Sequence, residues 1–138
     1  MKKKFQVPSE LSQVQKTSEQ ALDFLKPLGL DDASVFDIRL CLEEALVNAI
    51  KYGNRQQKDL QVFVDVEVEG NAIRIRVEDQ GSGFPHEQLP DCTEGENKLL
   101  NHGRGVYLMR QLMDEVSYND KGNSLLMVKL LNSKRVNE

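Results

Sequence analysis

Residues that build metal sites and disulfide scaffolds are scarce in this sequence of 138 residues, which has two cysteines, two histidines and no tryptophan. No pair among Cys41, Cys92, His86 and His102 has zinc-ligand spacing, and the cysteine count does not indicate a disulfide scaffold. Long apolar runs are also missing, since none approaches the ~20 residues that a membrane helix needs. The basic start, MKKKFQVPSE, lacks the apolar core of a signal peptide. These absences predict a cytoplasmic protein with no membrane partner.

An excess of positive charge is absent as well. The chain has 18 lysines and arginines against 22 acids, and its formal net charge is −4. Because nucleic-acid-binding proteins usually have a basic face, we expect no direct nucleic-acid partner. A bound polyphosphate would need local positive charges or a metal ion. With 39% hydrophobic and 29% charged residues, the sequence is typical of a globular domain, and we expect a single domain over residues 1–138.

The spacing of apolar residues predicts the element order β-α-α-β-β-loop-α-β-β, which favours an α+β two-layer sandwich over a doubly wound parallel sheet. Lys2 to Lys4 would form a frayed end, and Cys41 would be a buried thiol. The first expected elements are a short edge strand at Phe5–Val7, a helix from the N-cap Ser9 to Pro27 and Gly29, and a helix from Asp31 to Gly53 and Asn54. Strands at 60–70 and 71–79 would then form a hairpin with one wet face. A helix from Gly103 would be followed by strands at 115–120 and 124–131, joined at Lys121 to Asn123.

Glu44 and Asn48 form the first candidate for chemistry. Four residues on an α-helix correspond to about 400° of rotation, so both side chains lie on one face, one turn apart. Asp37, Cys41 and Tyr52 continue this face. A solvated polar stripe would have the same pattern, but the flanking residues in LCLEEALVNAI are nearly all apolar. A carboxylate and an amide in such surroundings need partners or a function.

The stretch VEDQGSGFP, from Val77 to Pro85, is the second candidate. Glycine supplies the φ > 0 conformations of turns, so the stretch is compatible with an ordinary turn after a strand. It is equally compatible with a nucleotide site, where the Asp79 carboxylate accepts a hydrogen bond from an exocyclic amine. Gly81 and Gly83 would then let the backbone approach a base closely.

Gly103-Arg104-Gly105, before a helical pattern, is the third candidate. It is compatible with a flexible hinge or with phosphate binding, because the free N–H groups at a helix start attract anions. The sequence is neither a P-loop nor a dinucleotide fingerprint. Residues 84–102 precede it as a long connection with little periodicity, a length typical of a lid or binding loop.

In this order, the three motifs resemble those of the GHKL (Bergerat-fold) ATPases, which include histidine-kinase catalytic domains, gyrase and MutL. EALVN stands in place of their N box, DQGSGF of the first glycine box and GRGVYLM of the second. The similarity runs from about Phe5 to Leu131. Within the group, the chain is most similar to stand-alone anti-sigma factors that are also serine-protein kinases, as seen in CLEEALVNAIKYGN and GRGVYLMRQLMDEVSY. The lack of a preceding phosphoacceptor-histidine helix pair disfavours a whole histidine kinase.

The resemblance implies a Bergerat fold with a mixed, mostly antiparallel sheet against about three helices, and it implies ATP and Mg²⁺ as cofactors. By this resemblance, Asn48 would bind Mg²⁺ and Glu44 would be the general base, with Glu43 as the neighbouring alternative. Asp79 would contact the adenine amine, and Gly81 and Gly83 would shape the base pocket. Phosphate would be bound by Gly103, Gly105 and the following amides, such as that of Val106, its charge would be neutralised by Arg104 and Lys98, and residues 85–102 would form the ATP lid. Two departures from the family pattern are Tyr52, where many relatives have histidine, and a lid with one glycine, Gly95, and one clear hydroxyl, Thr93.

The implied function is a partner-switching kinase that phosphorylates a serine of a STAS-domain anti-anti-sigma protein. It would sequester a sigma factor or an equivalent target when that antagonist is phosphorylated. A homodimer through the sheet edge and the first helix is a further expectation. Two alternatives stay open, a non-enzymatic Bergerat-fold module that only holds a partner and a detached histidine-kinase catalytic domain.

Overall fold

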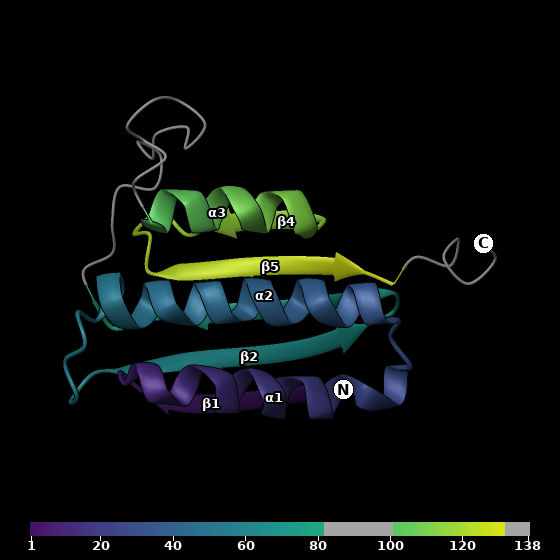
Figure 1. Ribbon diagram of the computed structural model, residues 1–138, viewed down its shortest axis with the longest axis horizontal. Helices are drawn as coiled ribbons and strands as arrows, with labels where there is room; N and C mark the ends of the chain where they lie inside the picture. Colours follow the sequence, from purple (N-terminus) through teal and green to yellow (C-terminus); the bar gives the residue numbers. More distant parts are fainter. Residues whose placement is uncertain (82–100, 132–138) are drawn as a thin grey trace.

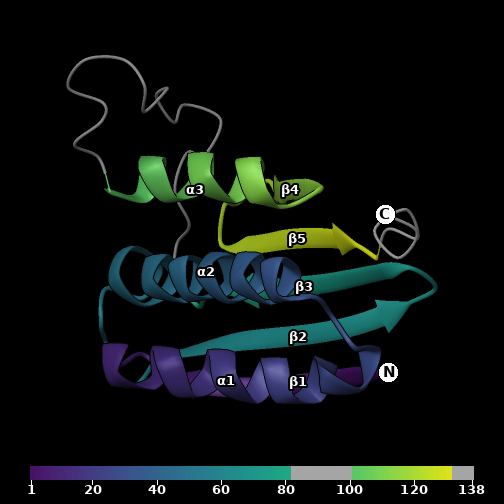
Figure 2. The same cartoon turned by 45° about the vertical axis from the view of Figure 1, so that its right-hand side comes forward.

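Five strands form one sheet in the order β1-β2-β3-β5-β4, and three helices cover one face of it (Figures 1 and 2). The computed structural model describes residues 1–81 and 101–131, and for residues 101–105 the backbone alone. All four strand pairings are antiparallel. The α+β two-layer sandwich is thus confirmed, with a sheet that is antiparallel throughout the described strands. The elements are β1 (Lys2–Pro8), α1 (Val14–Leu25), α2 (Asp32–Asn48), β2 (Gln61–Glu69), β3 (Ala72–Glu78), α3 (Asn101–Leu112), β4 (Glu115–Tyr118) and β5 (Ser124–Leu130).

The core lies between the sheet and the helices. Alternate residues of the central hairpin point into it, and its fully buried members include Val62, Val64, Val66, Ile73 and Ile75. The opposite face of the hairpin is charged, and its register places Lys4 opposite Asp65 and Asp65 opposite Arg76. This alternation confirms the hairpin with one wet face.

The helix ends follow local chemistry. Asp31 caps α2, since its Oδ1 accepts a hydrogen bond from the Ser34 N–H at 2.8 Å. Gly29 adopts a φ of +64° after a short 3-10 turn at Lys26–Leu28, as expected for a left-handed helix stop. After Asn48, α2 widens into a π-helical turn over Ala49–Gly53, and the chain leaves it at Asn54. Cys41 is fully buried, as expected. Every helix in the described part of the chain is too short or too polar to span a bilayer.

Three expectations about element boundaries are wrong. Strand β1 begins at Lys2, so Lys2 to Lys4 pair with β2 and are not a frayed end. Ser9 is not an N-cap, because its hydroxyl donates to the Leu60 carbonyl at 2.6 Å, and α1 instead begins after a 3-10 turn at Leu11–Gln13. Helix α3 begins at Asn101, two residues before the expected Gly103, so the last two residues assigned to the lid are helical.

The antiparallel connections gather four element ends at one end of the molecule. The carboxyl end of α2, the end of β3, the start of α3 and the start of β5 lie together on the left in both Figure 1 and Figure 2. These are the ends that carry Asn48, Asp79 and Gly103. The fold therefore brings the three motifs, which are far apart in sequence, to the same end of the molecule.

Candidate functional site

Asn48 and Asp79 line one pocket at this end of the molecule. Asn48 comes from the last turn of α2, and Asp79 follows β3 directly. The described walls leave about 20 Å³, room for about one water molecule, so a purine base would need more space than these side chains leave. The lining residues are Ala45, Asn48, Ala49, Val77, Asp79, Tyr118, Gly122, Asn123 and Leu125.

The amide of Asn48 is buried without full hydrogen bonding. The residue is 8% exposed, and its Nδ2 has no hydrogen-bond partner in the described part of the chain. An unpaired buried polar group costs about 1–3 kcal/mol, so a native structure rarely keeps one without a reason. Since this amide lies in the pocket wall, its position fits a group that binds a ligand.

Asp79 is a buried carboxylic acid with a perturbed pKa. Burial raises its pKa from 3.8 to about 6, an effect that the Gly81 N–H opposes by donating to Oδ1 at 2.9 Å. The nearby Glu78 raises the pKa further, whereas Lys121 lowers it. Within the described part of the chain, the Gly81 N–H is the hydrogen-bond donor to this carboxyl, so further lone pairs are left for a ligand.

Gly53 and Gly81 hold the Asp79 carboxyl between them. A Cβ atom on Gly53 would lie 2.2 Å from Asp79 Oδ2, and a Cβ on Gly81 would lie 1.9 Å from the Gly53 carbonyl oxygen. Neither distance is possible without movement of the backbone or of Asp79. The π-helical turn of Ala49–Gly53 therefore presents Gly53 as a close wall of the site, which agrees with the frequent occurrence of such turns at functional sites.

Asn54 connects three segments around Asp79, a role that sequence reasoning missed. Its Oδ1 accepts from the Gln80 N–H at 2.8 Å, and its Nδ2 donates to Ser9 Oγ and to the Gln61 carbonyl, both at 2.9 Å. The residue is 1% exposed. In the sequence, Asn54 is only a helix stop signal, and nothing local indicates its tertiary partners.

The turn between β4 and β5 provides the opposite wall, and sequence reasoning missed this contribution too. Asn123 accepts from the Asp79 N–H through its carbonyl at 2.9 Å, and its Nδ2 donates to the Asp79 carbonyl at 3.1 Å. Burial raises the pKa of the Tyr118 phenol, the nearby Arg110 lowers it, and Asp79 raises it. Such contacts arise from strand pairing, which the spacing of residues within one segment does not reveal.

Glu44 and Glu43 point to different neighbours. Glu43 Oε2 accepts from Ser18 Oγ at 2.5 Å and lies 3.9 Å from Arg39, so it faces α1. Glu44 is half-buried and contributes, with Asp37, to the electrostatic environment of Cys41. The side chain on the Asn48 side of the helix is therefore that of Glu44.

The remaining candidates lie at the start of α3 or outside the described residues. Gly83 and most of the expected lid, including Lys98, belong to the second group. Because α3 begins at Asn101, its free amides run to about Gly103, while those of Gly105 and Val106 fall within the helical hydrogen-bonding pattern. Val106 is 2% exposed and packs in the core. An anion at this helix start would therefore meet the amides up to Gly103 first.

A family model described as the histidine kinase-like ATPase domain matches residues 7–129, nearly the whole of this arrangement. The chain belongs to this family. The family implies ATP. The pocket offers polar groups that suit a nucleotide, namely the Asn48 side chain, whose Nδ2 has no partner among the described residues, and the buried Asp79 carboxyl, but its walls must move apart to admit the base. The GHKL resemblance inferred from the three motifs is thereby confirmed.

Serine-protein kinases named RsbW are similar to this chain. The identity is 32% over 120 residues for the Bacillus licheniformis protein and 30% over 116 residues for that of Bacillus subtilis. It is 28% over 117 residues for a Listeria monocytogenes protein. The alignments cover 79–80% of this chain and 72–74% of the relatives.

A solved structure of the RsbU and RsbW domains of Rv1364c from Mycobacterium tuberculosis has the same fold. Its TM-score is 0.65 at 15% sequence identity. The match covers 94% of this chain and 32% of that longer one. At this identity, the likeness is evidence of the fold alone, and the fold agrees with the antiparallel sheet and helix layer described above.

Proposed function

We propose that the protein binds ATP with Mg²⁺ and transfers the γ-phosphoryl group to a serine of a STAS-domain anti-anti-sigma protein. It would also sequester a sigma factor, or an equivalent target, while that antagonist is phosphorylated. The names of the RsbW relatives support the reaction class. The observation that carries the proposal is the meeting of the Asn48 amide and the Asp79 carboxyl in one pocket.

The roles divide along the pocket. Asp79 would accept a hydrogen bond from the adenine amine, with Gly81 and Gly83 shaping the base site. Asn48 would hold Mg²⁺ through its amide oxygen, and this ion would neutralise phosphate charge when bound. The start of α3 would bind phosphate through its free amides near Gly103, with Arg104 adding positive charge.

Glu44 would act as the general base. It lies one helical turn before Asn48 on the same face of α2, so the proton acceptor and the residue that would hold the metal are neighbours. Glu44 would take the proton from the serine hydroxyl as the serine oxygen bonds to the γ-phosphorus. The bond to the β-γ bridging oxygen breaks, and ADP leaves with that oxygen.

A phosphate-transfer assay tests the proposal. The purified protein, the antagonist encoded near it and ATP labelled at the γ-phosphate should yield a labelled, acid-stable phosphoserine. Asn48→Ala should abolish transfer, and Glu44→Gln should lower it by on the order of a hundredfold with nucleotide binding kept. Glu43→Gln is the matched control, because its amide oxygen can still accept from Ser18 and its side chain faces α1.

Three results would count against these assignments. Normal transfer by Asn48→Ala would remove the metal role, and equal losses in the two glutamate variants would remove the base role. An acid-labile product would identify a histidine acceptor and a detached histidine-kinase domain. Partner binding without any transfer would indicate a module that only holds its partner.

A further inference from the structure

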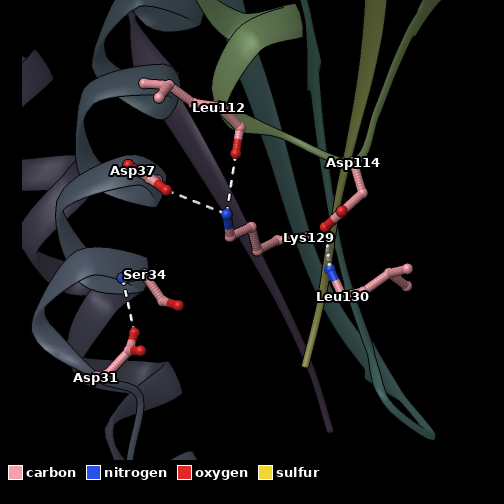
Figure 3. Close-up of polar contacts among 7 residues, drawn as sticks. All are labelled: Asp31, Ser34, Asp37, Leu112, Asp114, Lys129 and Leu130. Atoms are coloured by element: carbon pink, nitrogen blue, oxygen red, sulfur yellow. Dashed lines mark hydrogen bonds and ion pairs between the residues drawn. The ribbon is translucent and has the colours of Figure 1, made fainter. Parts of the chain in front are cut away.

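Lys129 is a buried lysine whose partners lie at the other end of the helix layer from the pocket. Its side chain is 7% exposed and projects from β5 toward the helices. The Nζ atom donates to Asp37 Oδ2 at 3.1 Å and to the Leu112 carbonyl at 2.9 Å (Figure 3). A buried ammonium is costly unless it is paired and hydrogen-bonded, and here both conditions are met.

The two partners belong to two different helices. Leu112 is the last residue of α3, so its carbonyl has no partner within the helix, and a cation there complements the helix dipole. Asp37 lies in the second turn of α2. The ammonium thus joins the carboxyl end of α3 to the first half of α2, and both contacts are seen in Figure 3.

Two hydrogen bonds of Asp114, just after α3, fasten the same end of the helix to β5. The Asp114 N–H donates to the Val128 carbonyl at 2.9 Å, and Asp114 Oδ2 accepts from the Leu130 N–H at 2.7 Å. Val128 and Leu130 flank Lys129 on β5. The end of α3 is therefore held to β5 on both sides of the point where Lys129 ties it to α2.

Asp37 shares one face of α2 with the proposed catalytic residues. It precedes Glu44 by seven residues and Asn48 by eleven, both of which are close to whole numbers of helical turns. Cys41 lies between Asp37 and Glu44 on this face. Burial, together with the nearby Asp37 and Glu44, raises the pKa of its thiol to about 11, which agrees with their place on one face of α2. The same face of α2 thus contacts the pocket at one end and the Lys129 ammonium at the other.

We propose that Lys129 is a positioning residue for the phosphate end of the nucleotide site, because its ammonium holds the far end of α3 against the helix that carries Glu44 and Asn48. This inference rests on the function proposed above. Gly103 lies nine residues from Leu112, about 13 Å along the helix. A tilt of about 10° at the Leu112 end would move Gly103 by about 2 Å, and displacements of this size greatly weaken catalytic arrangements.

The test compares a ligand with phosphates and one without. Adenosine would contact only the Asp79 end, whereas ATP with Mg²⁺ also needs Asn48 and the start of α3. Lys129→Met should lower ATP affinity by on the order of tenfold and leave adenosine affinity unchanged, as measured by calorimetry. The double variant Lys129→Met/Asp37→Asn should show the same loss of ATP affinity with unchanged adenosine affinity, and it leaves no unpaired carboxylate at position 37. Lys129→Arg should restore ATP affinity, and Lys16→Met, at an exposed lysine of α1, is the matched control.

Hydrogen exchange without nucleotide gives an independent measurement. The amides of α3 from Val106 to Leu112 should exchange faster in Lys129→Met, while those of β2 and β3 stay protected. Equal losses for adenosine and ATP, or an equal rise of exchange in strands and helix, would overturn the positioning role. A wild-type protein that binds adenosine and ATP equally would contradict the proposed function itself, and the inference would fall with it.

Discussion

At the scale of single residues, Asp79 combines burial with a charge that the free protein stabilises poorly. The residue is 6% exposed, and the pKa of its carboxyl is raised to about 6, mainly by burial. At pH 7 the group is therefore ionised in a site that favours the neutral form. Because the unfolded chain ionises near pH 3.8, this residue lowers folding stability as the pH rises from about 4 through 6.

Asp79→Asn should separate ligand binding from stability. The amide keeps an oxygen for the Gly81 N–H, so the free variant at pH 7 should be as stable as the wild type or more stable, by up to about 3 kcal/mol. Adenosine affinity should fall on the order of tenfold. An amine donor favours the ionised carboxyl, so wild-type affinity should also fall as the pH drops from 7 to 5, and the variant's affinity should not. Urea unfolding and calorimetry between pH 5 and 8 measure both effects.

Glu78→Gln provides the control for Asp79, since Glu78 is the exposed acid next to it. It should leave the affinity for adenosine at pH 7 unchanged and move the pH dependence slightly toward lower pH, because Glu78 raises the pKa of Asp79. An Asp79→Asn variant that loses stability while its folded fraction binds adenosine normally would return this residue to the role of an ordinary turn.

At the scale of elements, the sequence predicted the segments whose apolar spacing is regular. Helix α2 and the β2–β3 hairpin follow from their periodicity, and Asp31 and Gly29 mark helix ends by local chemistry. The length of β1 was missed because Lys2 to Lys4 are exposed, and pairing with β2 extends the strand regardless of their polarity. The early start of α3 was missed because its first residues lack apolar spacing.

The candidate site was predictable only where a motif is local. Glu44 and Asn48 share a helix face by spacing alone, and Asp79 follows a recognisable strand. The contributions of Gly53, Asn54 and Asn123 depend on contacts between elements, so no pattern within their own segments indicates them. The roles of the proposed site residues stay predictions until the transfer assay is done.

Asn54→Asp should destabilise the junction of β1, β2 and the residues after β3. The new carboxylate has no N–H to donate to Ser9 Oγ, and it faces the Gln61 carbonyl oxygen in a buried position. The loss of two buried hydrogen bonds and the added repulsion should lower the free energy of unfolding by roughly 2–4 kcal/mol. Urea denaturation of the free protein measures this change.

Asn119→Asp is a chemically matched control on the other side of the site. Asn119 is exposed, and its Oδ1 accepts from the N–H groups of Gly122, Asn123 and Ser124. A carboxylate accepts such bonds at least as well, and the variant loses one exposed bond, from Asn119 Nδ2 to Asn123 Oδ1 at 2.8 Å, so its stability should change by less than about 1 kcal/mol. Equal losses in the two variants would mean that Asn54 has no special place in the junction.

At the scale of the whole molecule, β1 is the longer of the two edge strands in the described sheet, with seven residues that pair with β2. An open groove lined by Lys3, Phe5, Gln20, Asp23 and Phe24 lies between this strand and α1. Lysines on an edge strand oppose uncontrolled pairing with other chains. We nevertheless propose a second copy as the partner for this edge, and the lysines would then determine how the pairing responds to salt.

A homodimer through two β1 strands would place six lysines along a strand pair about 23 Å long. Repulsion over such distances is screened at high ionic strength, so the dimer dissociation constant should fall several-fold between about 50 and 500 mM NaCl. Lys4→Gln should tighten the dimer at low salt and flatten its salt dependence, whereas the exposed Lys58→Gln between α2 and β2 should do neither. Sedimentation equilibrium measures these constants. A monomer at every concentration and salt, or a dimer that responds equally to both variants, would exclude the β1 edge as the interface.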